Sequence, residues 1–150
     1  MFVRLKRSVV PLMTSRQLAS SVSSVTETVQ SLVLQCEAES DSEPPLVVDL
    51  TLGSGSSTSH LLETTRARVL GVDVDPRTSR TMARLAEEWP ARFRGCQTAW
   101  SELPAQLQSQ EENTAGLCDL VMMDLGPSAA QLEDGRGFAG RSDPGLLDMR

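Results

Sequence analysis

The stretch Val47-Val48-Asp49-Leu50-Thr51-Leu52-Gly53-Ser54-Gly55 decides the fold of this chain. Residues 46–50 are a short apolar run that follows two prolines, a pattern typical of a buried strand. A glycine-rich turn comes next, and residues 56–65 are predicted to form a helix that Ser56 or Ser57 caps. A strand, a tight turn and a helix in this order predict the first unit of a parallel α/β sheet.

The rest of the chain continues the alternation of strands and helices. Further strands are predicted at residues 69–74, 93–100 and 117–125, and further helices at 22–36, after Asp75-Pro76 and at 101–108. Asp75 followed by proline is typical of a helix N-cap, and the helix after it would bury Met82, Leu85 and Trp89. Residues 37–45, 110–116 and 126–150 are predicted to be linker, loop and irregular chain. The fold class is therefore α/β, with about four parallel strands and helices on both faces.

Three polar features follow the predicted strands, where an open parallel sheet binds its ligand. The glycine turn with Gly53 and Gly55 follows the first strand, Asp73 and Asp75 end the second, and Asp124 ends the fourth. A glycine turn with an acidic residue about 20 positions later is typical of sites for adenosine-containing cofactors. The pattern leaves dehydrogenases and methyltransferases open. Thr58 occupies the position of the third glycine of the dinucleotide motif, which disfavours a dehydrogenase.

Charge is distributed unevenly along the 150 residues, which are enough for one domain. The first twenty residues contribute about +4, so the net charge of -6 leaves a balance near -10 for the others. A surface this acidic suits phosphate backbones poorly, so any nucleic-acid contact is expected to be local. Three distant cysteines and a single histidine argue against disulfides and a zinc site, and we expect no metal and no membrane span.

The amino-terminal segment, residues 1–20, has a composition of its own. It is rich in Arg, Lys and Ser and has no acidic residue, as in mitochondrial transit peptides. A basic arm is the alternative. We therefore expect three segments: residues 1–20, a helix and acidic linker at 21–45, and the folded domain at 46–150. The predicted location is the mitochondrial matrix, with the cytoplasm as the alternative.

The last part of the sequence resembles one family closely. It contains Met122-Met123-Asp124-Leu125-Gly126-Pro127-Ser128-Ala129-Ala130-Gln131-Leu132, then Arg136-Gly137-Phe138, then Leu147-Asp148-Met149-Arg150. These blocks, with the upstream ones at 49–55 and 71–76, resemble the bacterial-type small-subunit rRNA (cytosine-N4)-methyltransferases and their mitochondrial relatives, the methyltransferase-like protein 15 group. The resemblance covers residues 25–150.

The resemblance implies a Rossmann-like class I methyltransferase sheet that binds S-adenosylmethionine, of which this chain holds the amino-terminal part. By the resemblance, the glycine turn would approach the methionine part of the cofactor, Asp73 would hold the ribose and Trp100 the adenine. Asp124 and Gln131 would complete the pocket. The implied cofactor-binding set is Gly53, Gly55, Ser56, Ser57, Asp73, Trp100, Asp124 and Gln131.

The implied reaction transfers the sulfonium methyl group to the exocyclic amine of a cytosine in small-subunit rRNA. The cofactor carries the activated group, so the protein needs no covalent nucleophile and must align donor and acceptor. The target base must leave its stack to reach the pocket. Asp124 and the backbone carbonyl groups up to Pro127 are the candidates that accept hydrogen bonds from the amine. The expected partner is small-subunit rRNA or the small ribosomal subunit.

The sequence departs from the family's pattern at several positions. The family has Gly-Gly-His where this chain has Gly55-Ser56-Ser57. His60 would compensate for the missing histidine or be a solvated surface residue. The family also continues beyond the last block with a substrate domain and more strands, so we expect a chain truncated before that domain and inactive by itself.

Alternative functions and roles stay open. A catalytically inactive relative that serves as a ribosome-assembly or interaction module is the main alternative function, and a nicotinamide-dependent oxidoreductase is disfavoured because the chain has no tyrosine. Asp75 is interpreted as an N-cap rather than a ligand, and Trp89 as core. Trp100 contacts the cofactor or only packs, and Asp49 is a site neighbour or a turn-forming residue.

Overall fold

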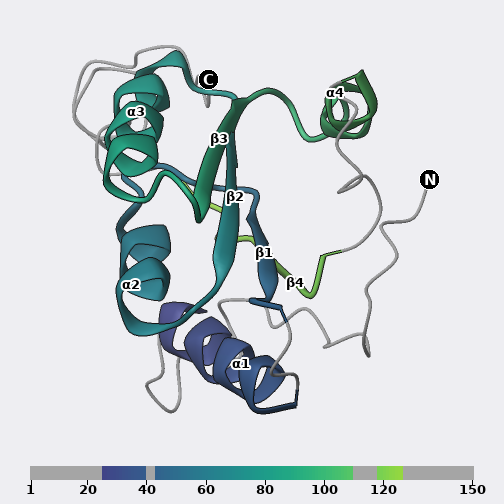
Figure 1. Cartoon of the computed structure of the whole chain (residues 1–150). Helices are drawn as coiled ribbons and strands as arrows, with labels where there is room; N and C mark the ends of the chain where they lie inside the picture. Colours follow the sequence, from purple (N-terminus) through teal and green to yellow (C-terminus); the bar gives the residue numbers. More distant parts are fainter. Residues whose placement is uncertain (1–24, 40–42, 110–117, 127–150) are drawn as a thin grey trace.

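Strands and helices alternate throughout the described part of the chain (Figure 1). The computed structural model describes residues 25–39, 43–109 and 118–126. In chain order the elements are α1 (Val25–Glu39), β1 (Leu46–Asp49), α2 (Ser56–Thr64), β2 (Arg68–Asp73), the 3-10 helix η1 (Pro76–Thr78), α3 (Ser79–Glu88), β3 (Phe93–Gln97), α4 (Leu103–Ser109) and β4 (Leu120–Met122). No helix among these residues is long and apolar enough to cross a membrane.

The four strands form one parallel sheet in the order β3-β2-β1-β4. Asp49 at the end of β1 pairs with Gly71 of β2 and with Met122 of β4, while Asp73 pairs with Gln97 of β3. All four strands therefore end at the same edge. The direction in which strands are added reverses between β1 and β4, which is where sheets of this Rossmann-like type bind their ligands.

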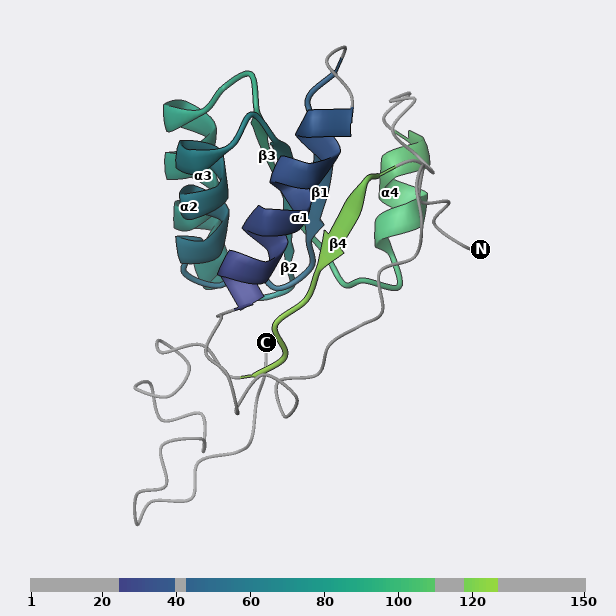
Figure 2. The same ribbon diagram turned by 90° about the horizontal axis from the view of Figure 1, so that it is seen from below.

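Helices cover both faces of the sheet (Figure 2). α1, α2 and α3 lie on one face, over the larger apolar cluster, whose fully buried members include Leu61, Leu85 and Val33. α4 lies on the other face, where Leu103 packs with Leu70 and Val72 in a smaller cluster. The predicted α/β class with helices on both faces is confirmed.

Element boundaries differ from the predictions at a few positions. The first helix runs to Glu39 rather than ending at residue 36, and the predicted start at 22 lies outside the described residues. The third strand ends at Gln97, because the chain then turns and the Thr98 N–H group donates to the Asp73 carbonyl oxygen (3.0 Å). The fourth strand is shorter than predicted. The whole predicted loop at 110–116, and all of the predicted irregular chain at 126–150 except residue 126, lie outside the described residues.

Helix caps give one confirmation and one correction. Asp75 caps η1, since its carboxylate accepts a hydrogen bond from the Arg77 N–H group (3.0 Å). The prediction that Ser56 or Ser57 caps α2 is wrong. The N-cap of α2 is Gly55, whose φ of 74° lies in the left-handed region that favours glycine, and no side chain caps that helix. Trp89 is half-buried at the end of α3, and the three cysteines, all of them among the described residues, form no disulfide bond.

Candidate functional site

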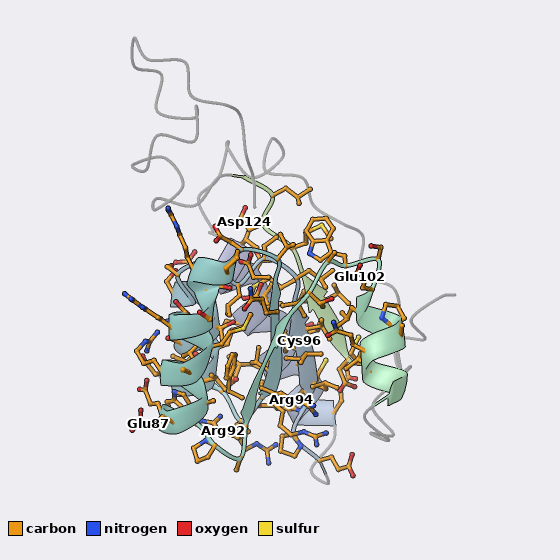
Figure 3. All side chains as sticks on the ribbon, turned by 90° about the horizontal axis from the view of Figure 1, so that it is seen from above. Glu87, Arg92, Arg94, Cys96, Glu102 and Asp124 are labelled. Atoms are coloured by element: carbon orange, nitrogen blue, oxygen red, sulfur yellow. The ribbon has the colours of Figure 1, made fainter. Side chains whose placement is uncertain are left out.

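A pocket of about 1000 Å³ lies at the edge where the four strands end. Figure 3 shows Asp124 at this end of the sheet and Arg92 and Arg94 at the opposite end. The described residues that line the pocket come from the turns after the four strands and from η1, α2 and α3: Asp49, Leu50, Thr51, Leu52, Gly53, Ser54, Ser56, Ser57, Asp73, Val74, Asp75, Arg77, Thr78, Thr81, Ala99, Trp100, Ser101, Met122, Asp124, Leu125 and Gly126.

Asp73 joins the turns after β1 and β2. One of its carboxylate oxygens accepts a hydrogen bond from the Gly53 N–H group (2.8 Å), and the other accepts one from the Asp75 N–H group (2.9 Å). These two bonds hold the carboxylate in a fixed orientation at the pocket wall. Each oxygen has a further lone pair, and the residue is only half-buried, so Asp73 can accept hydrogen bonds from a ligand's hydroxyl groups.

Asp49 is buried beneath the same turn. Its two oxygens accept hydrogen bonds from the Thr51 N–H group (3.0 Å) and from the Thr58 hydroxyl group of α2 (2.7 Å). Burial raises the pKa of this carboxyl above 3.8, the two hydrogen bonds oppose that rise, and the charges of Asp73 and Asp124 add to it. Both interpretations of Asp49 therefore hold, since it shapes the turn and lines the pocket.

Thr51 connects the turn after β1 with the chain after β4. Its hydroxyl oxygen accepts a hydrogen bond from the Asp124 N–H group (2.8 Å), while its own N–H group donates to Asp49. The Asp124 side chain is exposed at the mouth of the pocket. Sequence reasoning missed Thr51, although the Asp-x-Thr spacing of the glycine-turn block places its hydroxyl group directly after a strand that ends in the site.

The two glycines of the turn have different roles. Both adopt left-handed conformations, with φ of 51° at Gly53 and 74° at Gly55. A Cβ atom at Gly55 would lie 2.7 Å from the Thr81 methyl carbon and 3.0 Å from a Leu85 methyl carbon. Gly55 is thus required for packing against α3. Unlike Gly53, it is not among the described residues that line the pocket, which gives its predicted cofactor contact no support.

Ser57 and His60 are held by α1 rather than by the site. The hydroxyl groups of Ser57 and Thr26 share a hydrogen bond (2.7 Å), and His60 Nε2 lies 3.1 Å from Gln30 Oε1. Ser57 still lines the pocket, as does Ser56. His60 is half-buried and is not among the described lining residues. His60 is therefore a partly solvated residue that contacts α1, and the structure gives its predicted role as a replacement for the missing histidine no support.

Trp100 lies at the rim of the pocket on the side of β3. Its indole N–H group donates to the Leu50 carbonyl oxygen (2.6 Å), which fixes the ring while 45% of the residue stays exposed. The residue is therefore positioned both to support the loop and to contact a ligand. Gln131 and Pro127 lie outside the described residues, and their predicted roles stay predictions.

Negative charge dominates the described lining of the pocket. Four aspartates line it, two of them buried, and Arg77 is the one basic residue among the described lining residues. Sequence reasoning did not name Arg77, Thr78 or Thr81, which η1 and α3 bring to the wall. Within the part of the chain that the structure describes, no group of three or more His, Cys, Asp or Glu residues is suited to hold a metal ion.

Comparisons with known proteins agree with the family resemblance of the sequence blocks at 49–55, 71–76 and 122–150. The model of the MraW methylase family matches residues 20–150. Proteins named ribosomal RNA small subunit methyltransferase H are similar to the chain. One from Methylorubrum extorquens is 39% identical over 109 residues, covering 71% of this chain and 30% of the relative. The one from Nitrobacter winogradskyi is 39% identical over 104 residues, covering 69% and 30%.

Other similarities are shorter or weaker. The protein of the same name from Kocuria rhizophila is 36% identical over 114 residues, covering 73% of this chain and 33% of the relative. A solved structure of a putative methyltransferase, yhhF from Escherichia coli, is similar at 18% identity with a TM-score of 0.41, and the match covers 57% of this chain and 46% of that one. The chain spans about 30% of the length of the first relatives, and the family model matches most of it. This chain belongs to the MraW methylase family.

Proposed function

We propose that this chain supplies the cofactor site of an S-adenosylmethionine-dependent methyltransferase that acts on N4 of a cytosine in small-subunit rRNA. Family membership and the names of the relatives support the reaction class. The observation that carries the proposal is the Asp73 carboxylate, which the Gly53 and Asp75 N–H groups hold at the pocket wall.

The pocket suits the chemical groups of this cofactor. The lone pairs of Asp73 that remain can accept hydrogen bonds from ribose hydroxyls, and the exposed Trp100 ring offers an aromatic face for adenine. The first N–H groups of α2 have no partner within the helix, so they favour a carboxylate at the mouth of the pocket. Four aspartates against one arginine among the described lining residues favour a positively charged sulfonium group.

The chain's own residues would orient the reaction. When bound, the cofactor supplies the activated methyl group. Thr51 holds the Asp124 backbone, so the exposed Asp124 carboxylate stays close to the glycine turn. From there the carboxylate can accept a hydrogen bond from the amine of an unstacked cytosine, which orients the nitrogen for attack.

Calorimetry with S-adenosylmethionine tests the cofactor site. We expect Asp73→Ala to weaken binding by about tenfold or more, because a ligand hydrogen bond to a charged group is lost. Asp119→Ala is the matched control, since Asp119 also accepts a backbone hydrogen bond, from the Leu46 N–H group (2.8 Å), but at the other end of β1. Absence of binding at millimolar cofactor, or equal affinity of the two variants, would exclude the proposed site.

A ribosome-assembly or interaction module is the second candidate. The hydrogen bond between Ser57 and Thr26 favours it, because it commits to α1 the position where the family has a cofactor-contacting histidine. The double variant Ser56→Gly/Ser57→His separates the two functions. If this variant binds the cofactor and the natural chain does not, the natural chain is better described as an assembly or interaction module than as a methyltransferase.

We further propose that the protein acts in mitochondria. The support is the basic, acid-free composition of residues 1–20, which is typical of transit peptides. We expect these twenty residues to carry a fluorescent protein into mitochondria, and the same segment with Arg4, Lys6 and Arg7 changed to Gln to leave it in the cytoplasm. Cytoplasmic fluorescence of the unchanged fusion would contradict the proposal.

A further inference from the structure

A second cleft, of about 430 Å³, lies at the opposite edge of the sheet, where β1, β2 and β3 begin. Figure 3 shows Arg92 and Arg94 at this end, away from Asp124. Its described lining contains three arginines and no acidic residue, the reverse of the first pocket: Leu46, Arg68, Val69, Leu70, Pro90, Ala91, Arg92, Phe93, Arg94 and Leu107. The chain has a net charge of -6, so a cleft lined by basic residues differs from the rest of the surface. Its positive charge favours an anionic ligand.

Arg92 supplies charge to the cleft, but the structure already uses its donors. Its guanidinium group donates to the carbonyl oxygens of Leu62 (2.6 Å) and Thr65 (2.8 Å) at the end of α2. The same group stacks on the Trp89 ring at 4.5 Å. Arg92 is therefore a fixed structural cation beside the cleft rather than a direct ligand.

Arg68 is different, because its Nε–H group is buried and has no hydrogen-bond partner in the described part of the chain. A buried donor without an acceptor is costly, and one on a charged group especially so. Arg94 lies beside Leu70 on the neighbouring strand, so Arg68, two residues earlier on the same face, is its diagonal neighbour. Arg94 therefore adds a second positive charge to the lining of the cleft.

We propose that this cleft binds a backbone phosphate of the RNA substrate, with the Arg68 guanidinium group as the principal donor. A guanidinium group presents its donors in a planar fork that matches phosphate oxygens. The apolar walls formed by Leu70, Pro90 and Leu107 suit the sugar that follows each phosphate. The choice of RNA rests on the proposed function, while the oxyanion chemistry rests on Arg68.

The side-chain NMR signal of Arg68 Nε–H tests the site on the unmodified full chain. We expect inorganic phosphate, and then a short single-stranded oligouridylate that lacks the proposed target base, to shift this signal and to slow its exchange with water. The Arg80 signal is the internal control, since Arg80 is exposed on α3. An Arg68 signal that moves no more than that of Arg80 overturns the proposal.

Substitutions test the contribution of Arg68 to RNA affinity. We expect Arg68→Gln to weaken oligouridylate binding by about tenfold and to reduce the slope of log affinity against log salt by about 0.7, the value for one phosphate contact on a single strand. Arg80→Gln removes the same charge and should change affinity less than about twofold. Arg68→Lys should recover part of the affinity, because it keeps the charge without the fork. Equal losses in Arg68→Gln and Arg80→Gln contradict the proposal, and if Arg68→Gln does not fold, the NMR titration decides.

Cofactor calorimetry on the same variants separates this inference from the proposed function. We expect Arg68→Gln to bind S-adenosylmethionine as the unmodified chain does. If the chain binds the cofactor and Arg68→Gln binds RNA as the unmodified chain does, the phosphate site is overturned and the methyltransferase proposal stays intact. RNA binding through Arg68 without cofactor binding supports the phosphate site and contradicts the methyltransferase proposal.

Discussion

The buried carboxyl group of Asp49 makes the free energy of unfolding depend on pH, and a substitution at this one residue can test the effect. Its folded-state pKa is raised above 3.8, chiefly by burial. The folded chain therefore binds more protons than the unfolded chain between pH 3.8 and the raised value, and this group's contribution to the free energy of unfolding falls as pH rises through that window.

Asp49→Asn should remove this decline. Asparagine can still accept the Thr51 N–H bond, and its amide group can donate to the Thr58 hydroxyl oxygen, so the turn keeps both hydrogen bonds. We expect urea unfolding at pH 4 to 7 to show the variant gaining stability relative to the natural chain as pH rises. Glu63→Gln, which removes an exposed carboxylate on α2, serves as the control. A difference between Asp49→Asn and the natural chain that is constant with pH would contradict this assignment.

Single residues also show where sequence reasoning stops. Asp73 and Asp75 were predictable, because each lies within two residues of the end of a strand that the apolar pattern reveals. The contacts of Ser57 and His60 with α1 were not, because their partners Thr26 and Gln30 lie about 30 residues earlier in the chain. No local pattern shows that α1 packs beside α2.

The existence and type of each element followed from periodicity, while element ends depended on neighbouring elements. β3 ends early because its last predicted residues turn toward the Asp73 carbonyl oxygen. α2 begins at a glycine rather than a serine cap because the turn must pass α3 closely, where Thr81 and Leu85 leave no room for a Cβ atom. Both constraints are tertiary, so propensities within a short window could not predict them.

For the whole molecule, the parallel sheet with helices on both faces and the placement of the site at its carboxyl edge followed from the rules for parallel α/β folds, while the strand order came from the structure. The family blocks at 49–55 and 71–76 both lie at that edge. The net charge of -6, by contrast, predicted a surface that binds phosphate poorly. A sum over the whole chain cannot show that three arginines lie together in one cleft. Residues 68, 92 and 94 come together only because β2 and β3 begin side by side, which requires the register of the sheet.

The two clefts lie at opposite ends of β2, so we expect them to bind their ligands independently. Asp73 is the last residue of β2 and Arg68 the first, which separates them by five strand steps, or roughly 16 Å. This exceeds the screening length of about 8 Å at physiological salt, so the charge of one ligand has little effect on the other. At constant ionic strength, phosphate should change the cofactor affinity by less than about twofold, and by linkage the cofactor should leave the Arg68 Nε–H signal in place. Calorimetry and NMR titration measure the two directions separately. A shift of the Arg68 signal on addition of cofactor would mean that the sheet between them transmits binding, and the two clefts would then have to be treated as one coupled site.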